Sequence, residues 1–152
     1  MRLANKVAVI TGGGSGFGAA ITTTFAREGA KVVVADINID AAETIAAQCG
    51  GMAVQTDVSS NDDMAALITV VMEQHGRIDI FVNNAGITHL PAPMEEIEET
   101  EFDRVMIVNS KSVYLSARHV VPIMKRQEAG AILNIASTAG VSPRPWLSWY
   151  NA

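Results

Sequence analysis

VAVITGGGSGFGAAI, residues 7–21, joins a short apolar run to a glycine-rich turn and the start of a helical stretch. A nearly continuous apolar run of this length is typical of a strand buried on both faces of a parallel sheet. Glycines allow a tight turn and a close approach of a ligand to the backbone, and a helix start offers free N–H groups and a partial positive charge. The stretch therefore predicts a strand–turn–helix unit that can hold a diphosphate group.

Four further β-rich runs follow along the chain, and helical stretches separate them. We expect strands at 7–11, 31–35, 52–56, 78–82 and 131–135, and helices at about 16–28, 40–48, 61–75 and 100–127. Apolar strands that alternate with helices are typical of a parallel sheet with crossovers on both sides. The prediction is an α/β fold with a doubly wound, Rossmann-type parallel sheet, in which residues 1–152 form a single dinucleotide-binding domain.

Composition narrows the classes of function. Hydrophobic residues make up 49% of the 152 residues, and the net charge is −5. An acidic balance without a basic stripe argues against a nucleic acid or an anionic membrane as a partner. We expect no signal peptide and no membrane helix, which needs an apolar run of about 20 residues. The only cysteine, Cys49, allows no disulfide framework, so a cytoplasmic location is expected.

Acidic residues follow the second and third apolar runs. Asp36 ends the second run, where a carboxylate can accept hydrogen bonds from the hydroxyls of an adenosine ribose and repels a 2′-phosphate. Ile37 comes next, and no Arg or Lys stands there to hold such a phosphate, so NAD is expected over NADP. The alternative is that Asp36 caps the following turn. Asp57 is expected either to cap the turn over residues 59–62 or to contact the adenine.

The stretch Asn83-Asn84-Ala85-Gly86 follows the fourth run. The carboxyl ends of parallel strands meet at one edge of the sheet, so these residues are expected beside the glycine-rich turn. Turn chemistry alone is one explanation of such a stretch. The interpretation that we favour is that the two amides hold the centre of the sheet and line the cofactor site.

The helix expected at 100–127 carries an amide on its apolar face. Thr100 and Asp103 form a pattern close to a capping box at its start. The apolar stripe is expected to consist of Phe102, Met106, Val113, Ala117, Val120 and Met124. Asn109 falls on this stripe, where an amide without partners would cost about 1–3 kcal/mol. A structural hydrogen bond to a neighbouring strand and a functional role both remain open.

Together these residues resemble the short-chain dehydrogenase/reductase family, in particular its 3-oxoacyl-carrier-protein reductase-like members. The resemblance covers essentially the whole chain in order, and it rests on Thr11, Gly12, Gly16, Gly18, Asp36, Asp57, residues 83–86, Asn109, Ser137 and Tyr150. It implies an oxidoreductase that transfers a hydride between NAD(H) and a small-molecule secondary alcohol or ketone. It also implies a homodimer or homotetramer.

The resemblance assigns a role to each matching residue. Tyr150 would exchange a proton with the substrate oxygen, Ser137 would hydrogen-bond that oxygen, and Asn109 would hold a water in a proton relay. The residues implied to contact NAD are Gly12, Ser15, Gly16, Phe17, Gly18, Asp36, Ile37, Asp57, Val58, Asn84, Ala85 and Gly86.

A phenol ordinarily titrates near pH 10, and a neighbouring cation is the usual means of making it more acidic. In the family this cation is a Lys four residues after the Tyr, a position that lies beyond Ala152. Lys111 is not expected to replace it. We therefore expect the chain to lack the C-terminal part of the family fold and to belong to a longer enzyme. The alternatives are a non-catalytic NAD-binding fragment or pseudoenzyme, and a module that self-associates through the helix at 100–127.

The histidines and tryptophans give less indication of function than the residues above. His75, His89 and His119 lack the spacing of metal ligands, so no metal is expected. Trp146 and Trp149 flank Tyr150, and they either wall an apolar substrate pocket or simply pack against the rest of the protein.

Overall fold

The five apolar runs form one parallel sheet. A computed structural model describes residues 1–152, and its strands are β1 (Val7–Thr11), β2 (Lys31–Asp36), β3 (Met52–Gln55), β4 (Ile80–Asn83) and β5 (Ala131–Asn134). They lie in the order β3-β2-β1-β4-β5. The direction of winding reverses between β1 and β4, and in open α/β sheets the crevice at such a reversal is where ligands bind.

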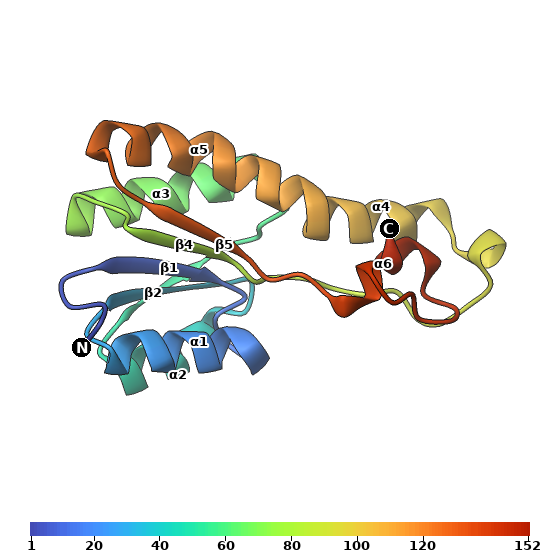
Figure 1. The fold of residues 1–152 in the computed structure, drawn as a ribbon, viewed down its shortest axis with the longest axis horizontal. Helices are drawn as coiled ribbons and strands as arrows, with labels where there is room; N and C mark the ends of the chain where they lie inside the picture. Colours follow the sequence, from blue (N-terminus) through green and yellow to red (C-terminus); the bar gives the residue numbers. More distant parts are fainter.

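Helices cover both faces of this sheet, as the doubly wound prediction requires. The main helices are α1 (Gly16–Arg27), α2 (Ile39–Cys49), α3 (Asn61–His75), α4 (Glu99–Met106) and α5 (Ser112–Gln127). Figure 1 shows α1 and α2 on one face, and α3 and α5 on the other. Short elements complete the fold, namely η1 (Met94–Glu96), the π-turn η2 (Ile107–Lys111), η3 (Thr138–Gly140) and α6 (Ser148–Asn151). None of the helices combines the length and the apolar character needed to cross a membrane.

Successive residues of the central strands enter two different cores. Val7 and Val9 pack into the core beneath α3 and α5, whereas Ala8 and Ile10 pack into the core beneath α1. Side chains alternate between the faces of a strand, so a strand buried on both faces must be apolar at every position. This is the physical reason for the continuous apolar runs in the sequence.

The prediction of one uninterrupted helix over 100–127 is wrong. The π-turn η2 separates α4 from α5, and its wider hydrogen-bonded turn changes the face that each later residue presents. Val120 is the only member of the predicted stripe that is fully buried. The residues buried on α4 and α5 are Val105, Ser112, Leu115, Ser116, Val120 and Ile123.

The predicted capping box is also wrong. The helix begins at Glu99, and its N-cap is Glu98, whose extended backbone presents its carbonyl oxygen to the N–H groups of Glu101 and Phe102. Thr100 therefore lies inside the first turn. The acidic residues Glu99 and Glu101 occupy that turn, where negative charge is favourable beside the helix N-terminus.

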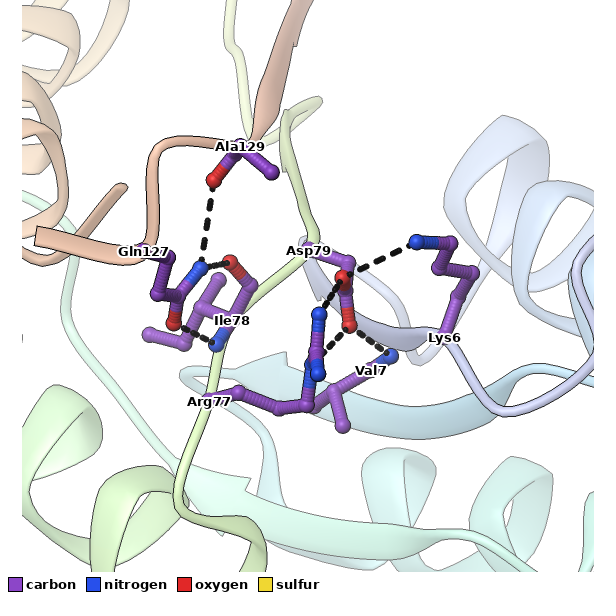
Figure 2. A network of polar contacts seen from close by, with 7 residues as sticks. All are labelled: Lys6, Val7, Arg77, Ile78, Asp79, Gln127 and Ala129. Carbon is purple, nitrogen blue, oxygen red and sulfur yellow. Dashed lines mark hydrogen bonds and ion pairs between the residues drawn. The ribbon is translucent and has the colours of Figure 1, made fainter. Parts of the chain in front are cut away.

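The fourth strand begins at Ile80, two residues later than predicted, and the backbone of Ile78 bonds to a side chain where a strand residue would bond to a neighbouring strand (Figure 2). The side chain of Gln127 accepts a hydrogen bond from the N–H of Ile78 at 3.0 Å and donates to its carbonyl oxygen at 2.8 Å. The same amide group donates to the carbonyl oxygen of Ala129. Gln127 thus replaces a neighbouring strand and joins the end of α5 to the start of β4.

Asp79 ties the amino ends of β1 and β4 together (Figure 2). Its carboxylate is 4% exposed and accepts hydrogen bonds from the Val7 amide at 2.9 Å and from two nitrogens of Arg77 at 2.6 and 2.8 Å. Lys6 adds an ion pair at 3.3 Å. Burial alone would raise the pKa of Asp79, but the hydrogen bonds from Arg77, Val7 and Lys6 outweigh it and hold the pKa below its usual value.

We predict that Asp79→Asn lowers the free energy of unfolding at pH 7 by about 2 kcal/mol, because hydrogen bonds to a charged group are lost. The carboxyl has a lowered pKa in the folded state, so its contribution exists above the ordinary pKa and disappears as the pH falls through the folded value. Urea unfolding between pH 7 and pH 3 should show the two proteins converging below about pH 4. Asp103→Asn, on an exposed residue of α4, is the control and should unfold like the wild type at each pH. A constant difference between Asp79→Asn and the wild type across this range would contradict the assignment.

Candidate functional site

The hydroxyl of Thr11 joins the carboxyl ends of the two central strands. It donates to the carbonyl oxygen of Val82 at 3.1 Å and accepts from the N–H groups of Asn84 at 3.0 Å and Ala85 at 3.2 Å. One donor and two acceptor sites are all that a hydroxyl has, so the group is fully used. Thr11 is 2% exposed, and the hydrogen bonds therefore stand in place of water for buried backbone groups.

Two successive amides extend this connection. Asn84 donates from its side chain to the carbonyl oxygens of Thr11 at 2.9 Å and Gly12 at 3.1 Å. Asn83 donates to the side-chain oxygen of Asn134 at 2.8 Å, across the pair of strands β4 and β5. The two asparagines therefore hold β1, the glycine-rich turn, β4 and β5 in one arrangement at the carboxyl edge of the sheet.

The glycine-rich turn packs directly against this edge. Gly12 has a φ of +61°, and a Cβ there would lie 2.9 Å from the Cα of Ala85. A Cβ on Gly18, in the first turn of α1, would overlap the carbonyl oxygen of Gly12. Larger residues at either position would push α1 and the turn away from the sheet.

The N-terminus of α1 differs from those of α2 and α3 in having no side-chain cap. Asn38 caps α2 by accepting from the Ala41 amide, and Ser60 caps α3 by accepting from the Asp63 amide. Ser15 stands at the same position of α1 and accepts no such hydrogen bond. The first N–H groups of α1 are therefore left for a ligand, next to the positive end of the helix dipole.

A cleft of about 610 Å³ opens at this edge, between β1 and β4. All the residues predicted to contact NAD line it except Gly18, which is buried beneath the turn. Sequence reasoning missed five residues of the lining, which are Thr56, Ser59, Ile87, Arg104 and Val108. Thr56 and Ser59 flank the predicted Asp57 and Val58, so their position at the end of the third strand could have predicted them. Arg104 and Val108 come from α4 and η2, and no motif marks them.

Asp36 lines the cleft and caps a turn at once. One carboxylate oxygen accepts from the Asn38 amide at 3.0 Å, and the other accepts from the Gly14 amide at 2.9 Å. The capping interpretation therefore holds, and the same carboxylate also steadies the glycine-rich turn. Each oxygen retains a further lone pair that a ribose hydroxyl could use.

Asp57, like Asp36, both caps a turn and lines the cleft. One of its oxygens accepts from both the amide and the hydroxyl of Ser59, at 2.8 and 2.7 Å, so it caps the turn before α3. Asp57 nonetheless lines the cleft, as do its neighbours Val58 and Ser59.

Asn109 lies in η2 and holds the segment that follows β4. Its side chain accepts from the Ile87 amide at 2.9 Å and donates to the Ile87 carbonyl oxygen at 2.8 Å. Of the two open interpretations, the structural hydrogen bond is present, but it reaches a loop residue and not a strand. The π-turn is the means by which the amide, on an otherwise apolar face, reaches this loop.

Ser137 follows the carboxyl end of β5, the outermost strand, and Tyr150 lies on α6. Ser137 is exposed and caps η3, accepting from the Ala139 amide at 3.1 Å. Tyr150 is half-buried on α6, which packs against η3. No hydrogen bond joins Ser137, Tyr150 and Asn109, and none of the three lines the cleft. The exposed Lys111 makes no ion pair.

The two tryptophans have different environments. Trp149 packs edge-on against Phe102 of α4, with ring centroids 5.2 Å apart, and donates to the Met94 carbonyl oxygen at 3.1 Å. Trp146 is 60% exposed. Trp149 therefore packs against α4, and it also lines a small hollow with Met94, Ile97, Glu99 and Phe102. The interpretation that the tryptophans wall an apolar substrate pocket remains a prediction for both.

The residues present fit a nicotinamide dinucleotide. The uncapped start of α1 suits a diphosphate, and the tight packing at Gly12 and Gly18 brings the turn close to the cleft. Asp36 supplies acceptors for a ribose. No group of His, Cys, Asp and Glu stands in a metal-binding arrangement.

Comparisons with known proteins agree with this geometry. Residues 6–152 match the family described as short chain dehydrogenase. The 4-formylbenzenesulfonate dehydrogenase of Comamonas testosteroni is 45% identical over 99% of this chain and 62% of its own length. The 3-oxoacyl-(acyl-carrier-protein) reductase of Thermotoga maritima is 37% identical over 100% of this chain and 63% of its own.

Solved structures share the fold. The 3-ketoacyl-(acyl-carrier-protein) reductase from Brucella melitensis, complexed with NADH, has a TM-score of 0.95 and 44% identity, over 98% of this chain and 64% of that one. An NAD⁺-bound xylitol dehydrogenase has a TM-score of 0.94 and 30% identity, over 99% of this chain and 60% of that one. The chain therefore spans between 44% and 64% of the length of the relatives that it matches.

We predict that Thr11→Val lowers the free energy of unfolding by about 2–3 kcal/mol, because the buried N–H groups of Asn84 and Ala85 lose their acceptor. Urea unfolding measures the change. Thr69→Val is the matched control, since the Thr69 hydroxyl is exposed and bonds only to the Ala65 carbonyl of its own helix. Equal effects of the two substitutions would mean that the Thr11 hydroxyl does not hold the strands together.

Proposed function

The chain belongs to the short-chain dehydrogenase family, and from this we propose that it is the dinucleotide-binding domain of an oxidoreductase that uses NAD(H). The observation that carries the proposal is the cleft at the switch point, where the uncapped start of α1 faces the ends of β1 and β4. The complexes of two relatives with NADH and NAD⁺ support a nicotinamide cofactor. The proposed contacts are those predicted from the sequence.

Asp36 supports NAD over NADP. Its carboxylate lies in the cleft with both oxygens held by backbone amides, and a phosphate brought to the same place would meet its negative charge. The only basic residue of the cleft, Arg104, is already engaged in two hydrogen bonds with the Glu101 carboxylate, at 2.7 and 2.8 Å. The cleft therefore offers a 2′-phosphate no cation that is free of a carboxylate partner.

The proposed reaction interconverts a secondary alcohol and a ketone, and bound NAD(H) would supply the hydride transfer. Ser137 would hold the substrate oxygen through its hydroxyl, which is exposed and still has its proton to donate. Tyr150 would move a proton to or from the same oxygen, since its own hydroxyl has no partner within the protein. A substrate seated against η3 and α6 would bring the two side chains to one atom.

Asn109 would support the reaction by holding a water and by fixing the position of Ile87. Its amide keeps one N–H and one lone pair beyond the two bonds to Ile87, and these would hold a water of a proton relay. The bonds to Ile87 also set the wall of the cleft next to Gly86. Asn109 is therefore proposed to act as a positioning residue as well as a relay.

Names of relatives support carbonyl and alcohol substrates in general, since they include a formylbenzenesulfonate dehydrogenase, ketoacyl reductases and a xylitol dehydrogenase. We propose a homodimer or homotetramer as the working form. The half-exposed Tyr114 on α5 lies on the helix through which such association would take place.

We predict that Asp36→Ala weakens NAD binding about tenfold and reduces the preference for NAD over NADP, because the ribose loses its acceptor and Gly14 loses its brace. Dissociation constants for both cofactors, measured by calorimetry, test this. Asp40→Ala removes an exposed acid near the start of α2 and is the control. Unchanged NAD affinity in Asp36→Ala would refute the ribose assignment.

We predict that Tyr150→Phe and Ser137→Ala each lower kcat by about a hundredfold or more in the full natural protein, while NADH binding stays within about twofold. Secondary alcohols with NAD are assayed by NADH formation, and Tyr114→Phe is the matched control. Wild-type protein that binds NADH and turns over no alcohol would instead favour a non-catalytic NAD-binding protein.

A further inference from the structure

The loop between η3 and α6 contains a strained residue. Trp146 has a φ of +65°, which is uncommon for a residue with a bulky side chain. Two other non-glycine residues have positive φ values, but Asn5 is of a type that tolerates them, and Glu128 is the C-cap of α5. Trp146 is 60% exposed, so burial of its side chain does not impose this conformation. Bonds elsewhere in the loop must therefore hold the strained backbone.

Asn151 supplies two of these bonds. Its side-chain oxygen accepts from the Arg144 amide at 3.2 Å, and its side-chain nitrogen donates to the Arg144 carbonyl oxygen at 2.9 Å. One side chain thus binds both polar backbone groups of one residue, and it closes the segment between them, with Trp146 inside, into a loop. Pro143 and Pro145 stand on either side of Arg144, and each fixes its own φ.

The same loop is attached to the chain that follows β4. The Ala92 amide donates to the Trp146 carbonyl oxygen at 3.0 Å. The Trp149 indole donates to the Met94 carbonyl oxygen at 3.1 Å, and its ring packs against Phe102. Figure 1 shows α6 beside α4, in agreement with these contacts. The loop therefore has a fixed place relative to α4 as well as a closed shape.

This loop connects the two residues that are proposed to bind the reacting oxygen. Ser137 caps η3, which precedes the loop, and Tyr150 lies on α6, which follows it. The first turn of α6 is continuous with the loop, because the amides of Tyr150 and Asn151 both donate to the Leu147 carbonyl oxygen, at 3.1 and 2.9 Å. The position of Tyr150 relative to Ser137 therefore depends on the shape of the loop.

We propose that Asn151 is a positioning residue, which holds the loop at Arg144 and thereby directs the Tyr150 hydroxyl to the substrate oxygen. The inference rests on the proposed function, in which Tyr150 exchanges a proton with that oxygen. Asn151 acts through Tyr150 and contributes no group to the chemistry. Its effect on the rate comes from geometry, since a displacement of about 1 Å at a reacting group can cost a hundredfold in rate.

The effect of Asn151 should be confined to the chemical step. No residue of the loop or of α6 lines the cofactor cleft, so a change in the shape of the loop leaves the proposed contacts with NAD in place. Proton transfer by a misplaced Tyr150 is slower, and it then limits the rate to a greater extent. A lower kcat should therefore be accompanied by a larger solvent isotope effect on kcat, whereas a smaller fraction of folded enzyme would lower kcat alone.

The test replaces Asn151 in the full natural protein and uses a secondary alcohol that the wild type oxidises with NAD. Asn151→Ala should lower kcat by about tenfold to a hundredfold and raise the solvent isotope effect, while the dissociation constant for NADH stays within about twofold. Asn151→Leu, which keeps the volume of the side chain and also loses both bonds to Arg144, should behave in the same way. Either variant carries the test if the other does not fold. A kcat equal to that of the wild type, or a lower kcat with an unchanged isotope effect, overturns the proposal and leaves the proposed function standing.

Asn61→Ala is the matched control. Asn61 is an exposed asparagine at the start of α3, and its side chain bonds to Asp62 and His119, away from the loop. Its replacement should leave both kcat and the isotope effect unchanged. If Asn61→Ala reproduced the changes seen in the Asn151 variants, the loss of any surface asparagine would have this effect and the proposal would fall.

A second measurement is independent of turnover. In complexes with NADH, the ¹³Cζ resonance of Tyr150, assigned from its loss in Tyr150→Phe, should shift or broaden in Asn151→Leu and remain in place in Asn61→Ala. The same Tyr150 resonance in Asn151→Leu and in the wild type overturns the proposal. A changed resonance in a protein whose wild type oxidises no alcohol supports the positioning of Tyr150 by Asn151 and refutes the proposed function instead.

Discussion

The arrangement of the site depends on one hydroxyl group, that of Thr11. It has three hydrogen-bonding capacities, and each is used to join the end of β1 to the end of β4. These are the strands between which the winding of the sheet reverses, so the distance between their ends sets the width of the cleft. The glycine-rich turn and the start of α1 follow from the same constraint, because Asn84 binds the carbonyl oxygens of Thr11 and Gly12.

The opposite ends of the same two strands are held by charge. Asp79 accepts hydrogen bonds from Val7, Arg77 and Lys6, and Gln127 anchors Ile78 beside it (Figure 2). Neutral groups fix the carboxyl edge, where the cofactor is proposed to bind, whereas a buried carboxylate fixes the amino edge. A strand pair clamped at both ends is a rigid support, and loops that carry function are commonly placed on such supports.

The segment after β4 combines firm attachment with one unsatisfied atom. Asn109 and Arg104 hold the backbone at Ile87 and Thr88, and the regular helix is interrupted at η2 so that Asn109 can reach it. His89 follows, and its buried Nε2 makes no hydrogen bond within the chain. Departures from local rules of this kind concentrate where proteins bind or react, and the interruption at η2 lies beside the cleft, which Val108 lines.

The sequence by itself determined the strands, most of the helices, the doubly wound sheet and most of the lining of the cleft, because these depend on local patterns. A strand buried on both faces must be apolar throughout, and a turn that packs on a sheet edge must be glycine. Only the tertiary structure decided the partner of Asn109, the hydrogen bonds to the Asp79 carboxylate, the presence of Arg104 in the cleft and the lack of a hydrogen-bond partner at His89 Nε2. The physical reason is distance along the chain. Val7 and Asp79 are 72 residues apart, and a hydrogen bond between such residues is specified by the packing of whole elements, which no local pattern records.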